Sequence, residues 1–327
     1  MHSGGWAGRA ASLLSRPLAA AAGPLTFTCP SGGTCWVGGA SGNWSNASKW
    51  SNGGPTSSTN ALIDNNNANG QGASTVTLDI GGAQVNNLTV DSDDSLSFNN
   101  NTSLTVNGTS ISNAGKIALN SAGNGTTLTI GAANVTLSGG GTLTMSNNSQ
   151  NFIQGASAAS QTLTNQQTIQ GSGNIGNGQM TLVNSGTINA NNAANALTIN
   201  ASGTGSGGTT NTGTLEATAG AELVLDGSIT NTGGTILATG TGSEVLLNGS
   251  TVAGGTLTSS SGGTIVGQSG AVLNGSTNTV TISSGSNFTI PNNTSSVLQG
   301  TITNNGTLNL SSVGNGTFLD ISGPPSR

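Results

Sequence analysis

The chain has 327 residues, of which 5% are charged, and its net charge is −5. Ordinary globular proteins carry roughly 25% charged residues, and five Lys and Arg residues do not supply the basic surface that nucleic acid requires. No apolar run approaches the roughly 18 residues of a membrane-spanning helix. The composition therefore excludes nucleic acid as a partner and predicts no transmembrane segment.

Residues 1–28 differ from the rest of the chain. Arg9 and Arg16 flank a short apolar pair and precede an alanine run that ends at Ala22. The small residues Ala20–Ala22 fit the cleavage site of a secretion leader, although Arg16 interrupts the apolar core that a leader needs. A start codon misplaced within a longer gene fits equally well. We expect a leader or a disordered N-terminus.

A second section, residues 29–72, opens with two cysteines. Cys29 and Cys35 enclose a Gly-rich loop, and a pair so close suits a small disulfide outside the reducing cytosol. Two thiols do not complete the four-ligand shell of zinc, and the only histidine is His2. We predict a disulfide, no metal and no cofactor.

The same section holds three tryptophans, Trp36, Trp44 and Trp50, within 15 residues. One interpretation is an aromatic platform that binds a sugar ring. The other is an N-terminal cap that covers the open end of a solenoid, where unpaired backbone and apolar core would otherwise be exposed. We favour the cap and keep the three tryptophans as candidate ligand-binding residues.

Residues 73–322 contain short segments in which apolar residues alternate with Thr, Asn or Ser, as in Thr75–Ile80 and Asn278–Ile282. This period of two predicts strands with Val, Ile and Leu facing a core and polar residues facing solvent. Asn-Gly pairs recur between the segments and suit sharp corners, but they also favour hairpins, which leaves antiparallel pairing open.

A loosely repeated phrase, Asn-x-Gly-Thr-Ile/Leu, begins at Asn184 and Asn211 and recurs in shortened form at Asn305. Related Gly-Thr pairs at Gly213, Gly234 and Gly255 lie 21 residues apart. A period near 20 is typical of solenoids. We predict an all-β fold, a right-handed parallel β-helix of about 11 to 13 coils of about 20 residues, followed by a tail at residues 323–327.

These repeats resemble the passenger segments of bacterial autotransporters and of filamentous-haemagglutinin-like adhesins. The resemblance lies in phrases such as Gly213-Thr-Leu-Glu-Ala217 and Gly234-Thr-Ile-Leu-Ala238, and it covers roughly residues 36–320. It implies a secreted or surface-displayed β-helix used for adhesion or as a stalk, associated with a bacterial outer membrane. The translocator barrel of that family has no counterpart in this sequence, which leaves the export route open.

Ionisable residues are too scattered to predict a catalytic site. Glu216, Glu222 and Asp226 fall within one repeat but have no basic partner there, since Lys49 and Lys116 are the only basic residues outside the termini. Glycoside cleavage requires paired carboxylates. We predict no catalytic residue.

The cluster Asp91-Ser-Asp93-Asp94 offers oxygen ligands of the kind that calcium prefers, but no calcium-binding repeat surrounds it. A polar turn is the favoured interpretation.

The sequence thus predicts a non-catalytic, extracellular or cell-surface adhesin or stalk. Its expected partners are glycans or matrix proteins of a host or environmental surface. A carbohydrate-binding or polysaccharide-cleaving β-helix is the first alternative. A self-associating matrix protein is the second, because low charge and open solenoid ends favour stacking.

Overall fold

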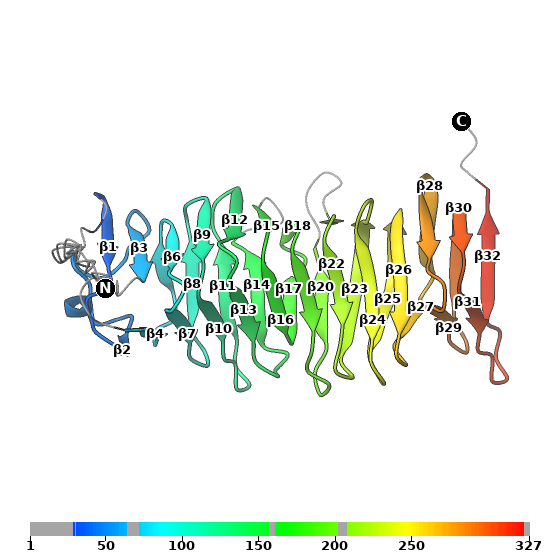
Figure 1. Ribbon diagram of the computed structural model, residues 1–327, viewed down its shortest axis with the longest axis horizontal. Coiled ribbons are helices and arrows are strands. Elements are labelled where there is room, and N and C mark those ends of the chain that lie inside the picture. The colour runs from blue at the N-terminus through cyan, green and yellow to red at the C-terminus, as the bar shows by residue number, and fades with distance from the viewer. Residues whose placement is uncertain (1–28, 30, 64–71, 157–160, 202–207, 324–327) are drawn as a thin grey trace, which may run out of the picture.

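The computed structural model describes residues 29, 31–63, 72–156, 161–201 and 208–323, so the predicted leader and most of the predicted tail lie outside the described residues. The chain forms an elongated stack of parallel strands, a β-solenoid of about 12 turns (Figure 1). The predicted parallel β-helix is confirmed, and every pairing between its named strands is parallel. The coils average about 23 residues, longer than the 20 predicted.

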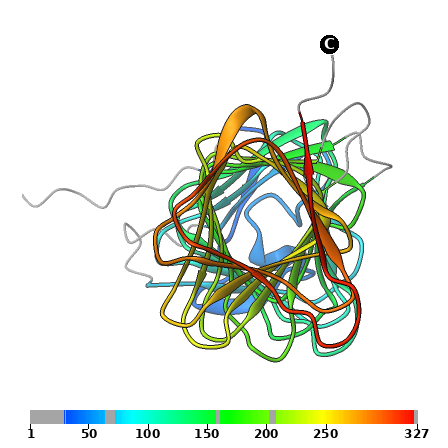
Figure 2. The ribbon, with the colours of Figure 1, turned by 90° about the vertical axis from the view of Figure 1, so that its right-hand side faces the viewer.

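Each coil contributes strands to three faces, A, B and C, and successive coils superimpose when viewed along the long axis (Figure 2). Face A comprises β2 (Ser41–Asn43), β4 (Thr75–Leu78), β7 (Ser95–Phe98), β10 (Lys116–Leu119), β13 (Thr142–Met145), β16 (Thr168–Gly171), β19 (Thr187–Ala190), β22 (Thr214–Ala217), β24 (Thr235–Thr239), β26 (Gly255–Ser260) and the C-terminal parts of β28 (Ala271–Ile282) and β30 (Ser295–Asn304).

Face B comprises β5 (Ala83–Val85), β8 (Ser103–Val106), β11 (Thr126–Ile130), β14 (Asn151–Gly155), β17 (Gly173–Gly176), β20 (Leu197–Asn200), the N-terminal parts of β23 (Glu222–Thr230) and β25 (Glu244–Ala253), β27 (Thr264–Gln268), β29 (Asn287–Ile290) and β31 (Thr307–Leu310).

Face C comprises β1 (Gly33–Cys35), β3 (Asn60–Ile63), β6 (Leu88–Val90), β9 (Ser110–Asn113), β12 (Asn134–Ser138), β15 (Gln161–Asn165), β18 (Met180–Asn184), β21 (Thr209–Asn211), the remaining parts of β23, β25, β28 and β30, and β32 (Phe318–Ser322). A single turn of 3-10 helix, η1 (Ala47–Lys49), joins β2 to β3.

Strand pairing runs through the predicted boundary at residue 73 without a break. β2 pairs with β4, and β3 pairs with β6. The cysteine- and tryptophan-containing section is therefore built into the first coils of the solenoid.

Apolar residues of neighbouring coils stack directly on one another inside the solenoid. On face A one such column is fully buried and consists of Leu96, Ile117, Leu143, Ile169, Ile188, Leu215, Ile236 and Leu257. Burying each of these side chains contributes roughly 1.5–3 kcal/mol. No coil achieves this burial alone, because each side chain depends on the coil above and the coil below it.

A ladder of buried asparagines lies at the corner between faces C and A. The side-chain amide of Asn165 donates to Asn184 Oδ1 (2.8 Å), Asn184 donates to Asn211 Oδ1 (2.8 Å), and Asn211 donates to Asn231 Oδ1 (2.7 Å). All four side chains are fully buried. The expectation that asparagines cover the outer surface is therefore wrong at these positions.

The ladder explains the repeated phrase. Asn211 turns inward, and its amide also donates to the carbonyl of Gly213 (3.2 Å). A Cβ atom at Gly213 would lie 2.1 Å from the carbonyl oxygen of Gly186 in the preceding coil. Thr214 then faces outward and Leu215 faces the core. The copies at Asn184 and Asn211 thus mark the corner between faces C and A, where glycine lets the backbones approach closely. The shortened copy at Asn305 leads into β31 and lies at the corner between faces A and B.

Replacing Asn211 by Ala leaves the Asn184 amide and the Asn231 oxygen without their ladder partners inside the protein. We expect a loss of about 2–4 kcal/mol in the free energy of unfolding, measured by urea denaturation. Asn134→Ala is the matched control, since Asn134 is exposed on β12 and should change stability by no more than about 0.5 kcal/mol. Equal effects of the two substitutions would show that the ladder does not stabilise the fold.

Candidate functional site

The three candidate tryptophans lie inside the N-terminal end of the solenoid. Trp36, Trp44 and Trp50 are only 1–3% exposed. Trp50 packs edge-on against both of the others, with ring centroids 5.3 Å from Trp36 and 5.0 Å from Trp44. The indole N–H of Trp36 donates to the carbonyl oxygen of Gly39, and the indole N–H of Trp50 donates to the carbonyl oxygen of Trp44. These rings fill the end of the core as a cap does, and none offers a free face to a sugar.

Two further contacts fasten this end of the molecule. Cys29 and Cys35 form a disulfide, with Cα atoms 5.7 Å apart. Asp79, which follows β4, accepts hydrogen bonds from the backbone N–H of Ser45 (3.0 Å) and from its hydroxyl (2.6 Å). Burial raises the pKa of Asp79, but hydrogen bonds, those from Ser45 foremost, together outweigh it and leave that pKa below its ordinary value. Asp79 thus holds the tryptophan-bearing segment against the second coil.

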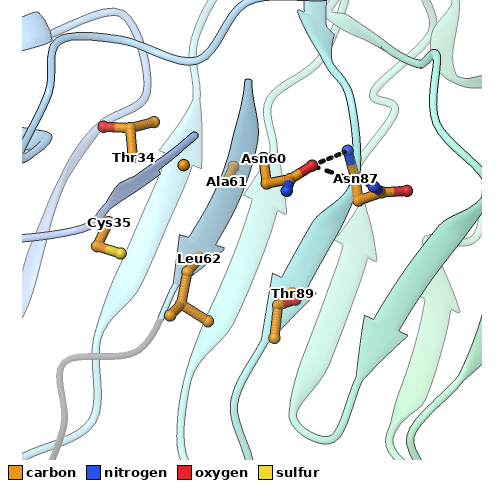
Figure 3. A pocket seen from close by; sticks show the side chains of 8 residues that line it. Thr34, Cys35, Asn60, Ala61, Leu62, Asn87 and Thr89 are labelled. Atoms are coloured by element: carbon orange, nitrogen blue, oxygen red, sulfur yellow. Dashed lines mark hydrogen bonds between the residues drawn. The ribbon is translucent and has the colours of Figure 1, made fainter. Parts of the chain in front are cut away.

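A hollow of about 330 Å³ lies on face C where this end meets the following coils (Figure 3). Its lining comes from β1, β3, β6 and the residue that precedes β6. The Asn60 oxygen accepts bonds from the Asn87 backbone N–H (3.2 Å) and side-chain amide (3.0 Å). Leu62 and Thr89 complete the wall. The Asn60 oxygen is therefore already bonded within the protein.

A second hollow, of about 340 Å³, lies at the corner between faces B and C near the other end of the solenoid. It is lined by Ser269, Gly270, Asn293, Thr294, Ser295, Gly316 and Phe318. Phe318 is 60% exposed. Phe318 is not among the candidate site residues identified from the sequence. Only the alternation of β32, which places Phe318 in an outward position, could have drawn attention to it.

The carboxylates form one pair that sequence spacing did not reveal. Glu222 of β23 and Glu244 of β25 are register partners in neighbouring coils on face B. Burial, and then the charge of Glu222, raise the pKa of Glu244, and burial raises the pKa of Glu216 on face A. Neither member of the pair lines either hollow.

The predicted polar turn at residues 91–94 is present between β6 and β7. Asp94 is buried and accepts a bond from the Ser74 backbone N–H (2.6 Å), and Asp91 caps its own turn through the Ser92 N–H (2.8 Å). Across the described part of the chain, no group of three or more His, Cys, Asp or Glu side chains is arranged to hold a metal ion.

These features define a class: a three-faced β-solenoid in which the two hollows described above are lined by uncharged residues. In the described residues no helix is long and apolar enough to cross a membrane. Comparisons of the chain with protein-family models, with curated proteins and with solved structures found no match.

The raised pKa of Glu244 makes stability depend on pH. The folded state holds this proton more tightly than the unfolded chain, whose glutamates titrate near the ordinary value of 4.5. The stability due to this group is therefore fully present below about pH 4.5 and is lost as the pH rises through the raised folded-state pKa.

We expect Glu244→Gln to raise the melting temperature at pH 7 and to change it little at pH 4, because glutamine removes the half-buried charge. Thermal unfolding followed by circular dichroism between these two pH values measures the effect. Glu222→Gln should give a smaller effect of the same sign, since it removes the neighbouring charge only. A Glu244→Gln variant that is no more stable than the parent at pH 7 would contradict the assignment.

Proposed function

We propose that this protein is a secreted or cell-surface β-helix that acts as an adhesin or as a stalk, without catalysis. The observation that carries the proposal is the uninterrupted stack of about 12 coils with almost uncharged faces. At about 4.8 Å per coil it makes a rod of roughly 55–60 Å. Such a rod separates its two ends, and its neutral faces favour many short-range contacts over long-range attraction.

Two further features support an extracellular setting. The disulfide between Cys29 and Cys35 is of the kind that persists in oxidising compartments. The outer faces carry hydroxyl and amide side chains, including a register of threonines on face A at Thr142, Thr168, Thr187, Thr214, Thr235 and Thr256. The resemblance of the repeats to autotransporter passengers and haemagglutinin-like adhesins points the same way.

Cleavage of polysaccharide is a weaker alternative. Its support is the Glu222–Glu244 pair, since neighbouring strands bring the two residues to roughly the separation used by retaining glycosidases. The pair lies outside both hollows, and Lys49 and Lys116, the two basic residues of the described chain, lie in other coils. Release of reducing ends can be followed in the binding experiment below.

The full chain should bind saturably to at least one member of a panel of polysaccharides and matrix proteins immobilised for surface plasmon resonance. Because the faces are nearly uncharged, the affinity should change by less than about twofold between about 0.05 M and 0.5 M salt. A steep fall with salt would contradict adhesion through neutral contacts. No binding across the panel by a folded protein would favour the stalk.

Self-association is a second candidate that one observation favours. In the coil formed by β30, β31 and β32, the core-facing side chains Leu310 and Ile321 are 48% and 81% exposed. Among the described strands, β31 pairs only with β29, and β32 only with β30. A surface of apolar side chains and unpaired strand edges fits the corresponding surface of a second copy.

Sedimentation velocity should show a concentration-dependent dimer that Ile321→Lys abolishes, because burying an unpaired charge in such an interface is costly. Val37→Lys is the matched control, since Val37 is 52% exposed at the opposite end of the solenoid. A parent protein that stays monomeric at all concentrations would remove this candidate.

A further inference from the structure

Phe318 faces outward, whereas the next residue of β32, Leu319, faces the core. It is the register partner of Ser295, whereas Leu319 pairs with the fully buried Ser296. The ring of Phe318, which is 60% exposed, therefore lies on the outer side of face C and not among the core-facing side chains of this coil.

The protein makes room for this ring. A Cβ atom at Gly316 would lie 2.6 Å from the tip of the Phe318 ring, so the ring rests on bare backbone. The turn that carries Gly316 is held by Asn292, whose side-chain oxygen accepts bonds from the backbone N–H of Val313 (2.7 Å) and of Asn315 (3.2 Å). The ring is thus positioned by a pinned turn in an exposed site.

Polar groups surround the ring on the other side of the hollow. Ser269 and Asn293 adopt positive φ values of 57° and 62°, so both corners turn sharply there. The Thr294 hydroxyl is used within the protein, where it accepts a bond from the Ser269 N–H (2.8 Å). Neither the Asn293 amide nor the Ser295 hydroxyl has a hydrogen-bond partner in the described structure. These two groups are available to a ligand.

We propose that this hollow is a subsite for one ring of an uncharged glycan, an inference that rests on the proposed adhesive function and names its ligand class. Phe318 stacks against the apolar C–H face of the sugar, and Asn293 and Ser295 bond to its hydroxyls. The volume of about 340 Å³ lies at the small end of ligand pockets, which suits a single ring.

The chemistry of the lining selects a neutral sugar. No lining residue is ionisable, and the nearest charged position along β32 is the exposed Asp320. The carboxylate of Asp320 disfavours the binding of uronic acids and sulfated sugars, because like charges repel. Arg and Lys, which would bind such anions, do not line the hollow.

The test uses the full chain and glucose-, galactose- and mannose-based oligosaccharides, with an oligouronate as the charged comparison, by isothermal titration calorimetry. We expect a neutral oligosaccharide to bind, and Phe318→Ala to weaken that binding by roughly tenfold. Phe318→Trp should retain binding. The control Phe152→Ala should leave affinity unchanged, because Phe152 is a half-buried outward ring on β14, in a distant coil.

Circular dichroism of Phe318→Ala should match that of the parent, since the ring is largely exposed. Three outcomes would overturn the subsite: neutral oligosaccharides that bind Phe318→Ala as tightly as the parent, preference for the oligouronate, or no oligosaccharide binding. If matrix proteins still bind in the last case, the adhesive function stands without this site. If matrix proteins do not bind either, the proposed adhesive function is contradicted together with the subsite.

Discussion

The in-register stacking of parallel coils is the constraint on which the rest of this structure depends. Neighbouring strands lie about 4.8 Å apart, so any residue placed in one coil must tolerate its counterpart directly above and below. Apolar positions consequently repeat as columns. At one corner, the inward asparagines from Asn165 to Asn231 are joined by a continuous chain of amide hydrogen bonds. A buried amide without such partners would be costly.

The same constraint explains how much of the fold was predictable. Alternation in segments such as Thr75–Leu78 directly reports which side chains face the core. The coil length was harder to predict because register fixes only the strands. Successive ladder asparagines are separated by 19, 27 and 20 residues, yet they stack without a break. Corners absorb the difference, and the spacing of a motif in the sequence therefore understates the regularity of the structure.

The candidate site was predicted less well, and for a physical reason. Clustering of Trp36, Trp44 and Trp50 indicates that large rings gather in one place but does not say whether their faces are free. In the structure they bury one another. The surroundings of the outward Phe318, and the pairing of Glu222 with Glu244, depend on which residues become register partners in neighbouring coils. Because coil length varies, the sequence does not show which residues these are. Contacts between coils could not be read from the sequence until the register was known.

The nearly uncharged surface determines which forces can act in recognition by this protein. On a highly charged protein, long-range fields would guide ligands and would depend on salt. Here recognition must rely on groups in direct contact, and along the solenoid such groups are mostly short hydroxyl and amide side chains that neighbouring coils repeat. An exposed ring such as Phe318 breaks that uniformity. Under the proposed function, the repeats supply length and a neutral background, and specificity falls to the few positions where a corner departs from the repeat.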